Sequence, residues 1–153
     1  QNVFVDLGNA ILKLLEANIP MISPGWIFAP RTEVFLKTLL NANGYPVFLD
    51  EMSTGKLWGF PYGTTTAVPI NIGTSSNKSE VYVVDFAQAV IGESMNLVVD
   101  SSQEAAYHDG SNVIAAFSQD QTVVRTIAEH DFGMRHDKAV AVLTQVSCKP
   151  GSV

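Results

Sequence analysis

Residues 30–48 read PRTEVFLKTLLNANGYPVF, and the motif LWGFP follows at Leu57–Pro61. The longer stretch predicts a short helix. Pro30 suits the first helical position, because its missing N–H would have no helical partner there and its φ already matches a helix. One apolar stripe at helical spacing is formed by Phe35, Leu36, Leu39 and Leu40. Asn43-Gly44 is expected to end the helix, since both residues tolerate positive φ.

Arg31 does not fit this helical pattern. A cation in the first turn opposes the helix dipole, typically at a cost of about 0.3–1 kcal/mol. We therefore expect Arg31 to have a carboxylate partner elsewhere, either in this chain or on a neighbouring subunit. The alternative is a solvated side chain, because surface ion pairs are weak.

The remaining pattern places a helix before a series of strands. Leu7, Ile11, Leu14 and Leu15 recur at helical spacing, which predicts a helix over 3–17. Apolar and β-branched runs predict strands at 26–28, 45–49, 81–92, 96–99, 113–117, 122–129 and 139–146. In the last run, alternation predicts that one face carries Val140, Val142, Thr144 and Val146. Helices followed by antiparallel strands indicate an α+β fold.

Composition limits the classes of protein to consider. A chain of 153 residues suits one or two small domains. A net charge of −6 argues against a general nucleic-acid or membrane-surface binder, which would carry a basic patch. The single cysteine, Cys148, excludes an internal disulfide and a cysteine-based zinc site, and it fits a reducing compartment. No apolar run is long enough to span a membrane.

Few residues suggest chemistry. HDFGMRHD, at 130–137, repeats His-Asp at a spacing that would place the two histidines roughly 20 Å apart along a strand. A tight turn at Gly133 could bring them together, but surface histidines are the expected reading, as for His108. Acidic pairs such as Asp50-Glu51 are expected to be solvated. We therefore predict no catalytic residue, no cofactor and no metal site.

Four segments, in order along the chain, resemble segments of the tailed-phage major capsid proteins of the Hong Kong 97 fold. The PRT helix with its Asn-Gly stop resembles the family's PRT-helix-(D/N)xxG segment, and Leu57–Pro61 resembles its LxGfP strand entry. Residues 84–93 are similar to its GDFxxxxxIgE strand, and residues 120–143 to its closing DQxxIRaixRxDfgvxxpxAfxvL segment. Ala29 and Val84 depart from the pattern, which often has Asn and Gly at those places.

The resemblance implies two helices packed on a central mixed or antiparallel sheet, the A domain, expected at 1–94. It implies long antiparallel strands of a partial P domain at 95–153. The family's N-terminal arm, extended E-loop and spine helix precede this region. Because they are missing and the chain begins with Gln1, we expect a fragment of a longer protein, which alone would not build a closed shell.

The function implied by the resemblance is structural and not enzymatic. The chain would belong to a phage or prophage major capsid subunit that self-assembles into hexamers and pentamers of an icosahedral shell. Its partners would be other capsid subunits, around DNA that is enclosed without specific binding, with no membrane. It would occur in the virion capsid, and in the host cytoplasm during assembly. The candidate subunit-contact residues are Arg31, Lys56, Arg125, His130 and Arg135, beside the polar segments 55–69, 73–79 and 101–112.

Two alternatives remain open from the sequence. The first is an encapsulin-like shell protein of a bacterial compartment, which shares the fold but packages enzymes. The second is a small α+β enzyme or ligand-binding domain, which a deep pocket with converging titratable groups would support.

Overall fold

The computed structural model describes residues 2–147, so Cys148 lies outside the described residues. The chain divides into two compact units: unit 1 is Gln1–Ala89 with Met134–Val153, and unit 2 is Val90–Gly133. The last strand belongs to unit 1 because it pairs with a strand before residue 89. Within the described residues, no helix has the length and apolarity needed to cross a membrane.

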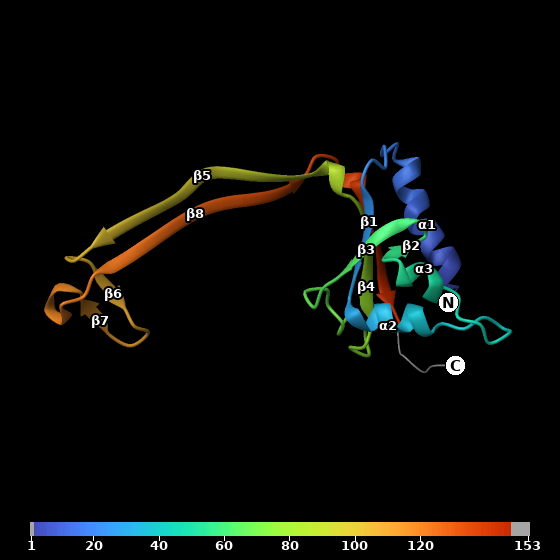
Figure 1. Ribbon diagram of the computed structural model, residues 1–153, viewed down its shortest axis with the longest axis horizontal. Coiled ribbons are helices and arrows are strands. Elements are labelled where there is room, and N and C mark those ends of the chain that lie inside the picture. The colour runs from blue at the N-terminus through green and yellow to red at the C-terminus, as the bar shows by residue number, and fades with distance from the viewer. Residues whose placement is uncertain (1, 148–153) are drawn as a thin grey trace. The chain divides into compact units, whose positions relative to one another are not determined.

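Unit 1 is built on a five-stranded mixed sheet (Figure 1). The strand order is β2-β3-β1-β4-β9, in which β1 runs parallel to β3 and each other pair is antiparallel. The strands span Lys56–Leu57 (β2), Phe60–Thr64 (β3), Pro24–Phe28 (β1), Ser79–Asp85 (β4) and Val140–Val146 (β9). This arrangement confirms the predicted α+β class with a mixed central sheet.

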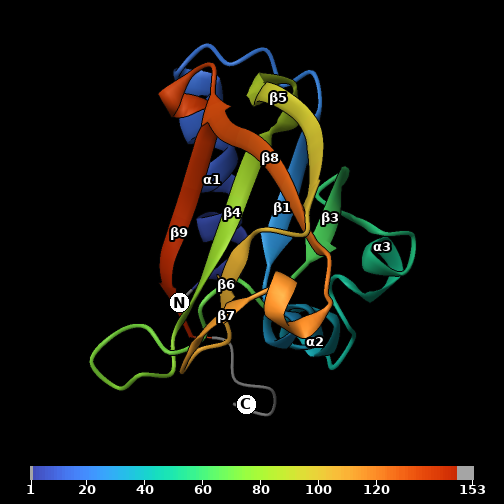
Figure 2. The ribbon, with the colours of Figure 1, turned by 90° about the vertical axis from the view of Figure 1, so that its left-hand side faces the viewer.

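Helix α1, Val3–Glu16, packs on this sheet beside β9, behind the strands in Figure 2. Its bounds agree with the predicted helix because the apolar stripe sets the buried face: Leu7, Ala10 and Leu14 are buried. The Asn2 side chain accepts a hydrogen bond from the Val5 N–H and caps the first turn.

Helix α2 spans Pro30–Thr38, so the prediction that it runs to Asn43-Gly44 is wrong. The cause is Asn41, whose side-chain oxygen accepts hydrogen bonds from the N–H groups of Asn43 and Tyr45, each at 2.9 Å. Such a turn offers the backbone an alternative to the helix. The strand predicted at 45–49 is also absent: a single bridge joins Leu40 to Pro46, and helix α3, Leu49–Ser53, follows.

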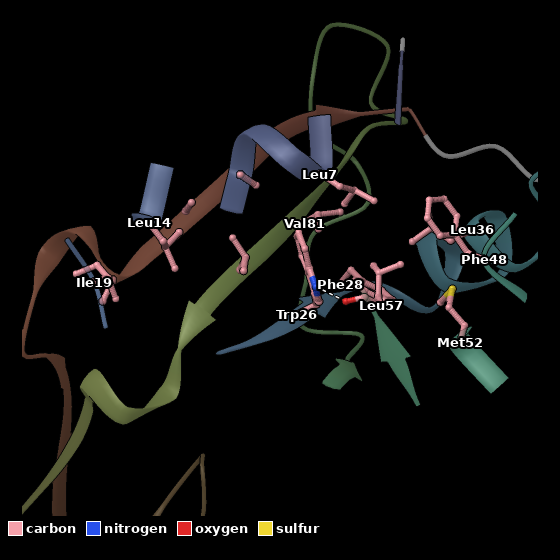
Figure 3. Close-up of a cluster of buried hydrophobic side chains, with 14 residues drawn as sticks. Leu7, Leu14, Ile19, Trp26, Phe28, Leu36, Phe48, Met52, Leu57 and Val81 are labelled. Carbon is pink, nitrogen blue, oxygen red and sulfur yellow. Dashed lines mark hydrogen bonds between the residues drawn. The ribbon is translucent and has the colours of Figure 1, made fainter. Parts of the chain in front are cut away.

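The core lies between the helices and the sheet, with Trp26 and Phe28 from β1 at its centre (Figure 3). Trp26, Phe28 and Leu57 have at most 1% of their surface exposed. The Trp26 indole N–H donates to the Leu57 carbonyl at 2.9 Å, so the one polar group of this side chain is satisfied inside the core.

Strand β9 contains a bulge that changes the predicted facing of its last residues. Ser79 pairs with Val146 but Val81 pairs with Leu143, so two residues of β9 face one residue of β4. Within the bulge, the backbone of Gln145 adopts a positive φ of 58°. Val146 therefore packs against the same core as Leu143, although simple alternation placed it on the opposite face.

Unit 2 is a long two-stranded ribbon with a small hairpin at its tip. Strands β5, Ala89–Ser102, and β8, Val123–Met134, run in opposite directions (Figure 1). The tip holds β6, Ala106–His108, paired with β7, Val113–Ala115, and the short helix η2, Phe117–Gln119. The strand predicted at 81–92 is broken by the short helix η1, Phe86–Gln88, and Gly133 lies in β8 and not in a turn.

Candidate functional site

The five residues predicted to contact other subunits are divided between the two units. Arg31, Lys56 and Arg135 belong to unit 1, whereas Arg125 and His130 lie on β8 of unit 2. Four of them are exposed and Arg31 is half-buried.

Arg31 is bound within its own chain. Its guanidinium donates to the carbonyl oxygens of Asn77, at 3.0 Å, and Ile70, at 3.2 Å. Among residues 2–147 its partners are thus backbone carbonyls and not the predicted carboxylate. The carbonyl dipoles offset a cation in the first turn of α2, and the contact anchors the 65–78 loop, which leads from β3 to β4.

The two candidates on β8 lie in a strongly acidic neighbourhood. Arg125 pairs with Asp100 across the ribbon at 2.9 Å, with side chains 68% and 53% exposed. His130 lines a shallow depression together with Glu93, Glu129 and Asp131. No group of three metal-ligating side chains is found within the part of the chain that the structure describes. Both candidate side chains are exposed on β8.

Sequence reasoning missed the role of Asp85, although the residue belongs to one of the quoted motifs. Its carboxylate is fully buried and accepts hydrogen bonds from three backbone N–H groups: Ser23 at 2.9 Å, Ala87 at 3.3 Å and Ile22 at 3.4 Å. It thereby ends β4, starts η1 and holds the turn before β1. An Asp directly after an apolar strand run was the available signal, since buried carboxylates need such donors.

Many apolar side chains of unit 2 are exposed in the part of the chain that the structure describes. On the ribbon and its tip, seven large apolar side chains are 59–81% exposed: Ile91, Leu97, Val99, Val113, Phe117, Val124 and Phe132. Exposed apolar surface of this extent marks an interaction site in soluble proteins. The exposed apolar side chains of the ribbon and its tip thus indicate a surface that suits association with another molecule.

Comparisons with known proteins identify the family to which the chain belongs. The family model described as the phage capsid family matches residues 2–145. The chain therefore belongs to the phage capsid family, and the resemblance found in the sequence is confirmed.

The chain is 40% identical over 141 residues to the major capsid protein of Klebsiella oxytoca phage phiKO2. The matched residues make up 92% of this chain and 33% of that protein. Among solved structures it is similar to one from Mycobacterium phage Ogopogo, with a TM-score of 0.61, 16% identity, and coverage of 91% of this chain and 48% of that one. A structure from Gordonia phage Cozz also gives a TM-score of 0.61, with 15% identity and coverage of 89% and 43%. The chain thus spans about a third of the length of the curated relative that it matches.

Proposed function

We propose that this chain is part of the major capsid subunit of a tailed phage or prophage, and that this subunit self-assembles into the hexamers and pentamers of an icosahedral shell. The observation that carries the proposal is the family match over residues 2–145. It favours a phage shell over a bacterial compartment shell and over a small enzyme or ligand-binding domain.

The exposed ribbon supports the association that a shell needs. Two-stranded sheets are marginally stable alone, and apolar side chains along both strands gain stability when another surface covers them. The A domain predicted at 1–94 and the P-domain strands predicted at 95–153 stay predictions. In this proposal unit 1, which also contains β9, corresponds to the apical A domain and the β5–β8 ribbon to part of the P domain. The net charge of −6 suits a shell that encloses DNA without binding it specifically. The subunit would work in the virion, after assembly in the host cytoplasm, with no catalytic role.

Assembly of the gene product that contains this chain tests the proposal. We expect light scattering to show very large particles, and negative-stain micrographs to show closed regular shells. A product that stays monomeric under assembly conditions would overturn the proposal.

Substitution with glutamate tests the candidate contact residues one at a time. We expect Lys56→Glu, Arg125→Glu, His130→Glu and Arg135→Glu to lower the yield of particles while leaving the circular dichroism spectrum unchanged, since these side chains are exposed. Arg31→Glu should also perturb the subunit itself, because Arg31 holds the 65–78 loop. Lys13→Glu, on the exposed side of α1, is the matched control. Normal particle yield from all four exposed variants would remove them as contacts.

A further inference from the structure

The loop after α2 carries the one Asn-Gly pair of the chain, Asn43-Gly44. Residues 41–46 are all exposed, and the loop projects from the end of α2 in Figure 1. Gly44 has a positive φ of 80°, and a Cβ added there would meet nothing within 4 Å. Solvent therefore has access to the Asn43 side chain and to the peptide bond that follows it.

An asparagine that precedes a glycine can react with its own main chain. The backbone nitrogen of the glycine loses its proton to hydroxide and attacks the side-chain Cγ of the asparagine. A new C–N bond closes a five-membered succinimide, while the bond between Cγ and Nδ2 breaks and ammonia leaves with a proton from water. Water then opens the ring at either carbonyl and gives aspartate or isoaspartate. Glycine favours the attack, because it has no Cβ to hinder the ring and its backbone is the least restricted.

In the folded chain Asn41 restrains the groups that would react. The N–H of Gly44, which contains the attacking nitrogen, donates to the Asn41 carbonyl at 2.9 Å. The Asn41 side-chain oxygen accepts hydrogen bonds from the N–H groups of Asn43 and Tyr45, each at 2.9 Å. The Asn41 N–H donates to the Tyr45 carbonyl at 2.8 Å and closes the turn. Because the Gly44 nitrogen must give up its hydrogen bond before it attacks, the reaction requires this turn to open locally.

We propose that Asn43 is a site of spontaneous deamidation, and that Asn41 sets the rate as a positioning residue that holds the Gly44 N–H away from Cγ. The product changes the loop. Aspartate adds a negative charge, and isoaspartate adds one carbon atom to the main chain, which moves the Gly44 N–H out of the position in which Asn41 binds it. Each isoaspartate formed therefore opens the turn permanently.

Incubation of the intact 153-residue chain at mildly alkaline pH, followed by mass spectrometry of its peptides, tests this site. We expect Asn43 to convert to aspartate and isoaspartate at a rate that rises with pH. The rate should be about tenfold higher or more in urea, where the hydrogen bonds of the turn are lost. Asn43→Gln should remove the product at this position, because its longer side chain would have to close a larger ring. Absence of product at Asn43 in the urea-unfolded chain would overturn the site.

Substitutions at Asn41 test its control of the rate. Asn41→Ala removes the acceptor of two N–H groups and should raise the rate at Asn43 in the folded chain about twofold to tenfold, which corresponds to one typical hydrogen bond. Asn41→Asp keeps an acceptor oxygen and should restore the low rate. Asn9→Ala, at an exposed asparagine of α1, is the matched control and should leave the rate unchanged.

Global unfolding is distinguished from local opening by the circular dichroism spectrum and by the other asparagines, which would also react faster in an unfolded chain. A rise confined to Asn43, with an unchanged spectrum, supports the local restraint. Equal rates in the wild-type chain and in Asn41→Ala would overturn the role of Asn41. A rate in the folded wild-type chain as high as that in urea would overturn it as well, whether or not the variant folds.

Discussion

Gly25 lies beneath the ring of Phe86, and this close approach explains why no larger residue stands there. A Cβ added at Gly25 would lie 2.7 Å from a ring carbon of Phe86 and 3.3 Å from the Pro61 carbonyl oxygen. The ring in turn follows Asp85, whose buried carboxylate fixes the backbone at the start of η1. The packing of the Phe86 ring on Gly25 thus depends on the backbone position that Asp85 sets at the end of β4.

We predict that Gly25→Ala destabilises the chain by about 1–3 kcal/mol, because the Phe86 ring must move. Gly63→Ala in β3 is the control, since a Cβ there meets nothing within 4 Å. Urea unfolding measures both changes. A Phe86→Ala change should make the cost of Gly25→Ala smaller, and equal costs for Gly25→Ala and Gly63→Ala would contradict this account.

Asp85 provides a second prediction at the scale of a residue. Asp85→Ala removes the acceptor of three backbone N–H groups, and we expect a loss of at least about 1–3 kcal/mol in the free energy of unfolding. Glu104→Ala, at an exposed carboxylate of unit 2, should change stability by less than about 0.5 kcal/mol. Thermal unfolding that ranks the two variants equally would refute the capping role.

At the scale of elements, strand β4 carries a pH-sensitive pair. Tyr82 donates to the carboxylate of Glu80, and this hydrogen bond, aided by burial and by the negative charge, raises the pKa of Tyr82 from 10.0 to about 12. Because the pKa of Tyr82 is raised in the folded state, the Tyr82–Glu80 hydrogen bond contributes its full stabilisation at pH values below 10.0, the pKa of this tyrosine in the unfolded chain. That contribution is lost as the pH rises through about 12.

We therefore expect the destabilisation caused by Tyr82→Phe to be largest below pH 10 and to shrink between pH 10 and pH 12. Urea unfolding at a series of pH values measures it, and the difference in phenolate absorbance between wild type and variant reports the titration of this ring. Tyr45→Phe, at an exposed tyrosine, is the control. A cost that does not vary with pH would contradict the hydrogen-bonded pair.

The bulge in β9 gives a matched pair of glycine substitutions. Gln145 holds a left-handed φ of 58°, which costs a non-glycine residue roughly 1–2 kcal/mol. Gln145→Gly should therefore be neutral or stabilising by up to about 1 kcal/mol, whereas Thr144→Gly next to it should destabilise by about 0.5–1 kcal/mol. Chemical denaturation compares them, and a larger loss at Gln145 would argue against the bulge.

Among the helices and strands, some could be predicted from the sequence and others could not. The helix at 3–16 and the strand around Trp26 were predictable, because one-sided apolar spacing decides both. The early end of α2 was not predictable, because Asn41 ends the helix through hydrogen bonds within its own turn. The spacing of apolar residues carries no information about such hydrogen bonds. The partners of Arg31 are 39 and 46 residues away in sequence, so only the fold could place them.

At the scale of the whole molecule, stability is unevenly distributed. Unit 1 has a core of buried aromatic and aliphatic side chains, whereas in unit 2 Ala116 is the one buried hydrophobic residue among those that the structure describes. A ribbon without a covering layer opens at low free-energy cost.

We predict that the amides of β5 and β8 exchange with solvent much faster than those of β1 and β4 in the isolated chain. In assembled particles the ribbon should gain protection, because a covering surface excludes water from its apolar side chains. Hydrogen-exchange mass spectrometry of both forms measures the difference. Equal protection of ribbon and sheet in the isolated chain would show that unit 2 is stable without a partner.

The Arg135 N–H donates to the Gln88 carbonyl at 2.7 Å, so the chain leaves unit 1 and re-enters it at adjacent points. Strands β4 and β9 then pair directly, with a register that does not depend on how many residues lie between them. The 90–133 segment is thus an insertion between two strands, β4 and β9, that pair directly in the sheet of unit 1. We therefore expect insertions or deletions within the 90–133 segment to change the length of the ribbon without changing the β4–β9 register, so that the same sheet can carry hairpins of different length.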